Sequence, residues 1–170
     1  MKDIFDHITS YDNFPNKGII FQDLLGLLRE PNIFRVLIDN MASSQSIKDS
    51  DAIIAIEARG FIFGSAIALR SGKPMVVARK PNKLPGELFK KKYELEYGSN
   101  ELTIQKDSIK KYQKFHIVDD VLATGGSVNC VSDLLLSVGK EVNGCSVVLE
   151  IKSLRGRSKL QIPLKSQFEV

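Results

Sequence analysis

Short apolar runs alternate with amphipathic segments along the 170 residues of this chain. Four runs that are long enough for strands and lack a regular polar alternation lie at 52–56, 74–78, 115–118 and 142–151. Such runs are typical of strands that are buried on both faces of a sheet. Phe5, Ile8 and Tyr11 recur at roughly helical spacing and predict a short first helix. Further segments with helical periodicity begin near Pro31, Gly60 and Gly126. This order predicts parallel βαβ units and therefore an α/β fold, with a parallel twisted sheet flanked by helices.

One segment interrupts this alternation. Residues 80–86 are rich in Pro, Gly and Lys and have no periodicity, as is typical of a loop. The stretches 93–97 and 101–105 then lie on either side of residues 98–100, which predicts a β-hairpin with a three-residue turn. Long insertions in compact domains are often lids or binding loops. We therefore expect a flexible lid over about residues 80–106.

The composition is that of a single globular domain. Apolar residues make up 43% of the chain and charged residues 26%, a mixture that can bury a core, and one domain usually has about 100–200 residues. No apolar run approaches the ~20 residues that span a bilayer, and the N-terminus has no signal-peptide core. The two cysteines, Cys130 and Cys145, offer neither a disulfide framework nor a metal cluster. We expect one domain over residues 1–170, in the cytoplasm.

The charge of the chain leaves two classes of ligand open. The net charge is +4, and the densest basic block is only Lys90-Lys91-Lys92. A nucleic-acid-binding protein usually concentrates its basic residues on one face. A small polyphosphate substrate would also suit a mildly basic chain.

The most informative candidate site follows the third apolar run. In open parallel sheets, ligands bind beyond the carboxyl ends of the strands, and residues 119–127 occupy that place. Gly125 and Gly126 allow the backbone to curl so that successive N–H groups form an anion-binding nest. Thr124 and Ser127 add hydroxyl donors, and the helix that follows offers its positive N-terminus. The segment therefore predicts a phosphate site.

Other phosphate-binding motifs are missing from the sequence. The Gly-x-x-x-x-Gly-Lys-Ser/Thr pattern does not occur, and no two glycines stand two apart, as the dinucleotide fingerprint requires. Unpaired, Asp119 and Asp120 would repel a phosphate. They fit a ligand with hydroxyl groups, or a hard cation such as Mg²⁺ that bridges phosphates. A sugar phosphate supplies all of these features, and the alternative is a helix N-cap with a solvated acid pair.

Residues 117–127 resemble the binding signature of type I phosphoribosyltransferases, which use 5-phosphoribosyl 1-pyrophosphate as the ribosyl donor. Further segments are similar to the adenine-specific members of that family, at 14–23, 57–61, 79–86, 95–98 (Leu-Glu-Tyr-Gly) and 153–157. The likeness covers roughly residues 14–160 with order and spacing preserved. It implies that family's fold, with an inserted β-hairpin lid and a small N-terminal hood over about residues 1–30 that binds the base.

The resemblance also implies a reaction. Adenine N9 would attack the anomeric carbon of the donor, giving AMP and pyrophosphate in purine salvage, through an oxocarbenium-like state. Asp119 and Asp120 would hold the ribose hydroxyls and stabilise the cationic ring. The residues expected to bind the 5′-phosphate are Ala123, Thr124, Gly125, Gly126 and Ser127. Those expected to bind the pyrophosphate are Glu57, Ala58, Arg59, Arg79 and Lys83. Mg²⁺ would be held mainly by substrate oxygens, and the Glu57–Ala58 peptide is expected to be cis.

The expected catalytic residues are Arg59, Asp119, Asp120 and Glu96, of which Glu96 would act as the general acid and share a proton with N7 of the base. Lys83 and Tyr97 are expected lid contacts. The residues expected to bind adenine are Ile20, Phe21 and Gln22, the phenyl ring by stacking and the other two through their backbone. This chain departs from the commoner family pattern at Gln22, where arginine is frequent, at Ser127, where threonine is usual, and at Glu57, where aspartate is usual.

Two alternatives stay open at this stage. One is a transferase specific for 6-oxopurines or xanthine, and the other is a regulator that senses the sugar phosphate without catalysis. Such regulators usually carry a DNA-binding segment, and the roughly 13 residues before Phe14 leave no room for a helix-turn-helix domain. A homodimer is expected from the resemblance, without a nucleic-acid or membrane partner. His7 and His116 are expected to be structural.

Overall fold

The computed structural model describes residues 2–94 and 99–170 of the chain and contains two compact units, residues 1–40 and residues 41–170. In the first unit, α1 (Lys2–Phe5) is followed by the antiparallel strands β1 (Thr9–Asp12) and β2 (Ile20–Asp23), then by the 3-10 helix η1 (Leu25–Arg29). Helix α2 (Pro31–Ala42) begins at the predicted proline and crosses the boundary between the units.

The predicted first helix is wrong beyond Phe5. Tyr11 lies on β1, where it pairs with Phe21 of β2, and the Ser10 hydroxyl donates a hydrogen bond to Gln22 Oε1 at 2.9 Å. Three apolar residues at helical spacing give only a weak local preference for a helix, and the pairing of β1 with β2 overrides it. The backbone of η1 also lies close to the residues before β1, because a Cβ on Gly26 would lie 2.3 Å from the His7 carbonyl oxygen.

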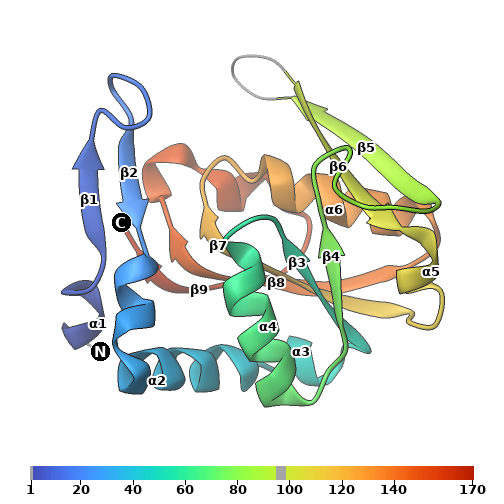
Figure 1. Ribbon diagram of the computed structural model, residues 1–170, viewed down its shortest axis with the longest axis horizontal. Helices are drawn as coiled ribbons and strands as arrows, with labels where there is room; N and C mark the ends of the chain where they lie inside the picture. Colours follow the sequence, from blue (N-terminus) through green and yellow to red (C-terminus); the bar gives the residue numbers. More distant parts are fainter. Residues whose placement is uncertain (1, 95–98) are drawn as a thin grey trace. The chain divides into compact units, whose positions relative to one another are not determined.

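The second unit is built on a five-stranded parallel sheet, in the order β4-β3-β7-β8-β9. Its strands are β3 (Ala52–Ile56), β4 (Met75–Ala78), β7 (Lys114–Leu122), β8 (Glu141–Glu150) and β9 (Leu164–Glu169). The α/β fold and four of the strands are confirmed (Figure 1). β9 was not predicted, because this edge strand is mostly polar and only Phe168 is fully buried in it. β7 also extends past the predicted end at Val118, so that Asp119 and Asp120 lie within the strand.

Helices cover both faces of this sheet. On one face, α4 (Gly60–Ser71) packs so closely on β3 that a Cβ on Gly64 would lie 2.5 Å from the Ala55 Cβ. On the other face, α6 (Gly126–Ser137) places Val131 in a buried cluster with Ile54. Because neighbouring residues of a strand point to opposite faces, α4 and α6 lie on opposite sides of β3. Two short helices, α3 (Gln45–Lys48) and α5 (Lys106–Ile109), and two 3-10 turns, η2 (Lys152–Leu154) and η3 (Gly156–Lys159), complete the unit.

The predicted hairpin is present as β5 (Leu88–Glu94) and β6 (Ser99–Gln105). Its first strand begins five residues before the predicted stretch 93–97, of which residues 95–97 lie outside the described residues. Its predicted turn at 98–100 is wrong, since Ser99 and Asn100 belong to β6 and pair with Glu94 and Tyr93. Strand pairing therefore continues further toward the tip than the Gly-Ser-Asn signal suggested. In Figure 1 the hairpin rises beside α6 and β4. Its movement as a lid stays a prediction.

The histidine and the two cysteines buried in the second unit are neutral. His116 is fully buried in β7, its Nε2 lies 2.8 Å from Ser146 Oγ, and burial lowers its pKa to about 3. Burial likewise raises the pKa of Cys130 to about 11, and both cysteines are free and buried. These residues therefore fit the structural roles expected of them. No helix within residues 2–94 and 99–170 is long and apolar enough to cross a membrane.

Candidate active site

Residues 123–127, here called the phosphate loop for the ligand predicted to bind there, join β7 to α6. Gly125 has φ +83, a left-handed backbone conformation that glycine adopts without strain, and α6 begins at the next residue. The first N–H groups of a helix have no partner within the helix and point out of its end. They face a cavity of about 80 Å³ that is lined by Tyr93, Asp119 and residues 121–128. This cavity is of a size for one phosphoryl group.

A second segment holds the phosphate loop from outside. Gly156, at the start of η3, approaches it so closely that a Cβ would lie 2.1 Å from the Ala123 carbonyl oxygen and 3.0 Å from the Gly125 nitrogen. The Asn129 side-chain amide donates to the Lys159 carbonyl oxygen at 3.0 Å, which joins the same turn to α6. No role was predicted for this turn. The only feature of the sequence that pointed to it is the likeness of residues 153–157 to the family.

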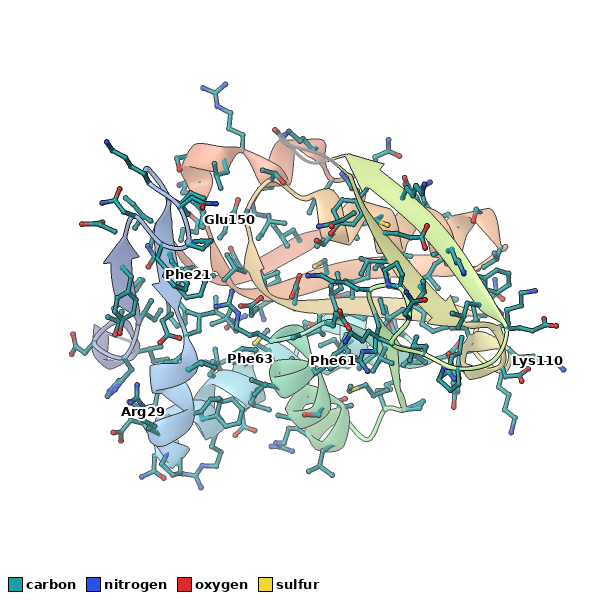
Figure 2. The ribbon with its side chains drawn as sticks, turned by 45° about the horizontal axis from the view of Figure 1, so that its top comes forward. Phe21, Arg29, Phe61, Phe63, Lys110 and Glu150 are labelled. Carbon is teal, nitrogen blue, oxygen red and sulfur yellow. The ribbon has the colours of Figure 1, made fainter. Side chains whose placement is uncertain are left out.

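Arg157 anchors that turn to the sheet. Its guanidinium forms an ion pair and several hydrogen bonds with Glu150, the last residue of β8, which is labelled in Figure 2. It also donates to the Leu164 carbonyl oxygen at 3.0 Å and to Ser166 Oγ at 3.0 Å, both on β9. Forked contacts of this kind fix the direction of an arginine side chain. Gly156 is thereby held in its place against the phosphate loop.

The two adjacent acids beside the cavity are buried and have different partners. Asp119 and Asp120 are only 8% and 7% exposed. Asp119 Oδ1 accepts the Asp120 N–H at 2.9 Å, and Gly60 leaves room for it, since a Cβ there would lie 2.8 Å from that oxygen. Burial, and then the charge of Asp120, raises the pKa of Asp119 well above its ordinary value. Asp120 Oδ2 lies 2.6 Å from Arg59 Nε and is held there by charge, because it accepts no aligned hydrogen bond in the described part of the chain.

The end of β3 adds a cluster of cations to this site. The Glu57–Ala58 peptide is cis, as expected, and brings the chain into the turn that carries Arg59. Arg79, at the end of the neighbouring β4, donates through Nε to Glu57 Oε2 at 2.7 Å and through Nη1 to the Lys83 carbonyl oxygen at 3.3 Å. Its guanidinium lies 5.6 Å from the centre of the ring of Phe61, which is labelled in Figure 2. The carboxyl ends of β3 and β4 therefore carry two guanidinium groups, of which that of Arg59 contacts the acid pair on β7.

Known proteins are similar in sequence to nearly the whole of this chain. A family described as "phosphoribosyl transferase domain" matches residues 26–165. The chain belongs to this phosphoribosyltransferase family. An adenine phosphoribosyltransferase of Prochlorococcus marinus (strain MIT 9515) is 60% identical over 97% of this chain and 96% of its own length. One from Gluconobacter oxydans is 42% identical over 96% and 92%.

Solved structures of the phosphoribosyltransferase family share the whole fold. An adenine phosphoribosyltransferase from Thermoanaerobacter pseudethanolicus superposes with a TM-score of 0.93 at 37% identity and covers 99% of both chains. The enzyme from Saccharomyces cerevisiae, solved with an imino-altritol bisphosphate and adenine, gives a TM-score of 0.89 at 38% identity, with 97% and 96% covered. The type I phosphoribosyltransferase fold is thus confirmed for this chain.

The structure brings most of the predicted site residues together, but not all. The predicted phosphate, ribose and pyrophosphate residues lie at the carboxyl ends of β3, β4 and β7 or in the segments that follow them. Ile20, Phe21 and Gln22 lie on β2 of the first unit, and their contact with adenine stays a prediction. Glu96 and Tyr97 lie outside the described residues. Tyr93, which lines the phosphate cavity, was missed, because the sequence does not tell which face of the hairpin meets α6.

Burial of Asp119 predicts a gain in stability when its charge is removed. Because the folded pKa of Asp119 lies above its ordinary value, the folded chain holds more protons than the unfolded chain between the two values, and the free energy of unfolding falls as pH rises through that window. Asp119→Asn keeps an oxygen that can accept the Asp120 N–H. We expect its Tm at pH 7.5 to rise by about 2–4 °C, while kcat/KM falls at least ~10-fold.

Thermal melts between about pH 4 and pH 8 test this expectation, and Asp107→Asn, an exposed acid of α5, is the control. The control should follow the wild-type Tm at every pH. A Tm of Asp119→Asn below that of the wild type would contradict the argument, since it would mean that the ionised carboxylate stabilises the fold.

Proposed function

We propose that this chain is an adenine phosphoribosyltransferase, which transfers the phosphoribosyl group of 5-phosphoribosyl 1-pyrophosphate to N9 of adenine and yields AMP and pyrophosphate. The observation that carries the proposal is a phosphate-sized cavity beside a buried acid pair, at the strand ends that also carry Arg59 and Arg79. The adenine-specific relatives, which match nearly the whole chain, support the choice of base.

The phosphate loop would bind the 5′-phosphate. Backbone N–H groups at the start of α6 and the hydroxyls of Thr124 and Ser127 line its cavity. A dianion is stabilised at such a helix end by the aligned peptide dipoles. Binding there fixes the distance of the ribose from the acid pair, so that Asp119 and Asp120 meet its hydroxyls.

The acid pair would act on the ribose in two ways. The carboxyl oxygens of Asp119 and Asp120 would accept hydrogen bonds from the ribose hydroxyl groups. A negative charge near the ring also stabilises the oxocarbenium-like character that develops as the bond to pyrophosphate lengthens. The pairing of Asp120 with Arg59 keeps that charge in place before substrate arrives.

The guanidinium groups would stabilise the leaving group. Arg59 is 30% exposed in its side chain and Arg79 is 34% exposed, so that both can reach a bound polyanion while keeping their carboxylate partners. Planar guanidinium groups bind phosphate oxygens with two parallel hydrogen bonds. Lys83, whose backbone is joined to Arg79, would add a further charge.

Mg²⁺ would fit this site as a partner of the substrate. Within the described ranges, no group of three or more His, Cys, Asp or Glu side chains could hold a metal by itself. Asp120 is already paired with Arg59, and burial disfavours the charged form of Asp119 by raising its pKa. Mg²⁺ bound chiefly by pyrophosphate and ribose oxygens would neutralise the charge of the leaving group. The acid pair would contribute at most one side of its coordination.

The base would be bound by residues of the first unit, with Glu96 as general acid. Phe21 already stacks edge-on against Phe14, with ring centres 5.1 Å apart, and this pair offers an aromatic surface for a purine. Gln22 accepts a hydrogen bond from the Ser10 hydroxyl with its side chain, and its backbone would contact the base edge. We also propose a homodimer, on the family likeness alone.

A purine panel tests the function. Purified protein is mixed with labelled 5-phosphoribosyl 1-pyrophosphate, Mg²⁺ and one of adenine, hypoxanthine, guanine or xanthine, and the nucleotide is separated and counted. AMP from adenine, with at most traces from the other bases and none after EDTA, is the expected result. If a nucleotide forms from hypoxanthine, guanine or xanthine instead, the proposed specificity for adenine is wrong. If the protein binds the donor but forms no product from any base, the result would favour a sensor of the sugar phosphate.

A further inference from the structure

A side chain of the hairpin reaches into the phosphate site. The hydroxyl oxygen of Tyr93, on β5, lies 3.2 Å from Ser127 Oγ, on the first turn of α6, and the two residues stand 34 positions apart in the sequence. Both residues also line the phosphate cavity. The contact therefore joins the hairpin to the group that would bind the 5′-phosphate.

Contacts along the same strand and helix hold Tyr93 in this position. The Cys130 thiol donates to the Lys91 carbonyl oxygen at 3.3 Å, and Lys91 Nζ lies 3.1 Å from Asp133 Oδ2. Tyr93 lies two residues after Lys91 on β5, about 6.7 Å along the strand. It contacts Ser127, which lies three residues before Cys130 on α6, about 4.5 Å along the helix axis. β5 thus runs along α6 toward the N-terminus of that helix, and the side chain of Tyr93 reaches its first turn.

The Tyr93 ring is anchored as well. It packs against the buried cluster that contains Leu102 and Val131, on the sheet face that α6 covers. Tyrosine has only two side-chain torsions, so that a packed ring fixes the place of its hydroxyl. The phenol oxygen is therefore held at the edge of the cavity.

We infer that Tyr93 is a positioning residue of the phosphate site, which orients the Ser127 hydroxyl for the 5′-phosphate; this inference rests on the proposed function. A phenol is a stronger donor than a serine hydroxyl, and phosphate oxygens only accept. The Tyr93 O–H donates to Ser127 Oγ, and the Ser127 O–H then donates to a phosphate oxygen. Hydrogen bonds in such a chain strengthen one another. Without the phenol, the Ser127 hydroxyl is free to rotate away from the anion.

Kinetics and binding of Tyr93→Phe test the inference. The ring and its packing remain, and only the hydroxyl is lost. Because the 5′-phosphate is bound alike in the ground and transition states, we expect KM for 5-phosphoribosyl 1-pyrophosphate to rise about 3- to 10-fold, with kcat within about 2-fold of the wild type. Binding of ribose 5-phosphate, measured by titration calorimetry, should weaken by the same factor. KM for the base should stay unchanged.

The matched control is Tyr112→Phe, which removes the same atom from a half-buried tyrosine that packs edge-on against Phe115, away from the cavity. It should match the wild type in both measurements. Ser127→Ala should weaken ribose 5-phosphate binding on its own. Adding Tyr93→Phe to Ser127→Ala should then have no further effect, because the phenol acts through Ser127.

Three results would overturn the inference. Unchanged ribose 5-phosphate affinity in Tyr93→Phe, with wild-type protein binding normally, would show that the contact does nothing for the ligand. A fall in kcat without a change in KM would place Tyr93 in another step. Full additivity in the double variant would mean that Tyr93 acts independently of Ser127. If the wild-type protein fails to bind ribose 5-phosphate at all, the proposed function fails first.

Discussion

Gly156→Ala is expected to abolish most donor binding while leaving the fold intact. A Cβ at this position would lie 2.1 Å from the Ala123 carbonyl oxygen, and contacts below 3.0 Å essentially never occur. The phosphate loop or the η3 turn must therefore move by about 1 Å. Misplacement of that size costs on the order of 10²-fold where a site depends on geometry. We expect kcat/KM for 5-phosphoribosyl 1-pyrophosphate to fall at least ~10²-fold.

We expect the phosphate loop, rather than the η3 turn, to move when the methyl group is added. Arg157 binds Glu150 on β8 and the backbone and Ser166 of β9, so that the turn beside Gly156 is tied to two strands. The loop, in contrast, ends in Gly125, whose backbone can adopt many conformations. The added methyl group therefore displaces the N–H groups that would bind the phosphate.

Steady-state kinetics and ribose 5-phosphate titration measure this effect, with Gly139→Ala as the control. Gly139 has φ +75 and open space around its Cβ position, so that alanine there strains the backbone but touches nothing. The control should lose stability, by roughly 1–2 kcal/mol, and keep its affinity for the donor. If Gly156→Ala bound ribose 5-phosphate as tightly as the control, the turn would not support the phosphate loop.

The parts of the fold that could be predicted are those fixed by local pattern. β3 matches the predicted run 52–56 because a strand buried on both faces needs apolar residues at every position. α2 begins at Pro31, as its helical pattern suggested. β9 and the β1–β2 pair could not be found this way. β1 and β9 are mostly polar, and β1 and β2 have only four residues each, so that pairing with a neighbour rather than composition makes them strands.

The same division holds for the site. The phosphate loop was predictable because its glycines, hydroxyls and helix N-terminus are contiguous in the sequence, at 123–127. Asp120 and Arg59 were each predicted, but their ion pair joins the ends of two strands and is a fact of topology. The contacts of Tyr93 with Ser127 and of Gly156 with Ala123 are equally remote in sequence. Such contacts depend on which faces of the helices, strands and loops pack together, and no short stretch of sequence shows that.

Glu96→Gln is expected to lower kcat by at least ~10²-fold, the usual size of a lost acid–base contribution. Glu96 lies outside the described residues, and the prediction rests on its place in the Leu-Glu-Tyr-Gly segment. A carboxylic acid can share a proton with N7 of the base as charge develops in the purine, whereas an amide of the same shape can only hydrogen-bond. KM for adenine should therefore change little, and the loss should fall on turnover.

Glu101→Gln is the matched control, since Glu101 lies on β6 of the same hairpin, opposite Lys92. It removes one negative charge from the hairpin and should retain wild-type turnover. Equal, small losses in both variants would attribute the effect to hairpin charge rather than to proton transfer. Wild-type turnover in Glu96→Gln would remove that residue from the chemistry, and the hairpin would then contribute to the reaction through the Tyr93 contact with the phosphate loop.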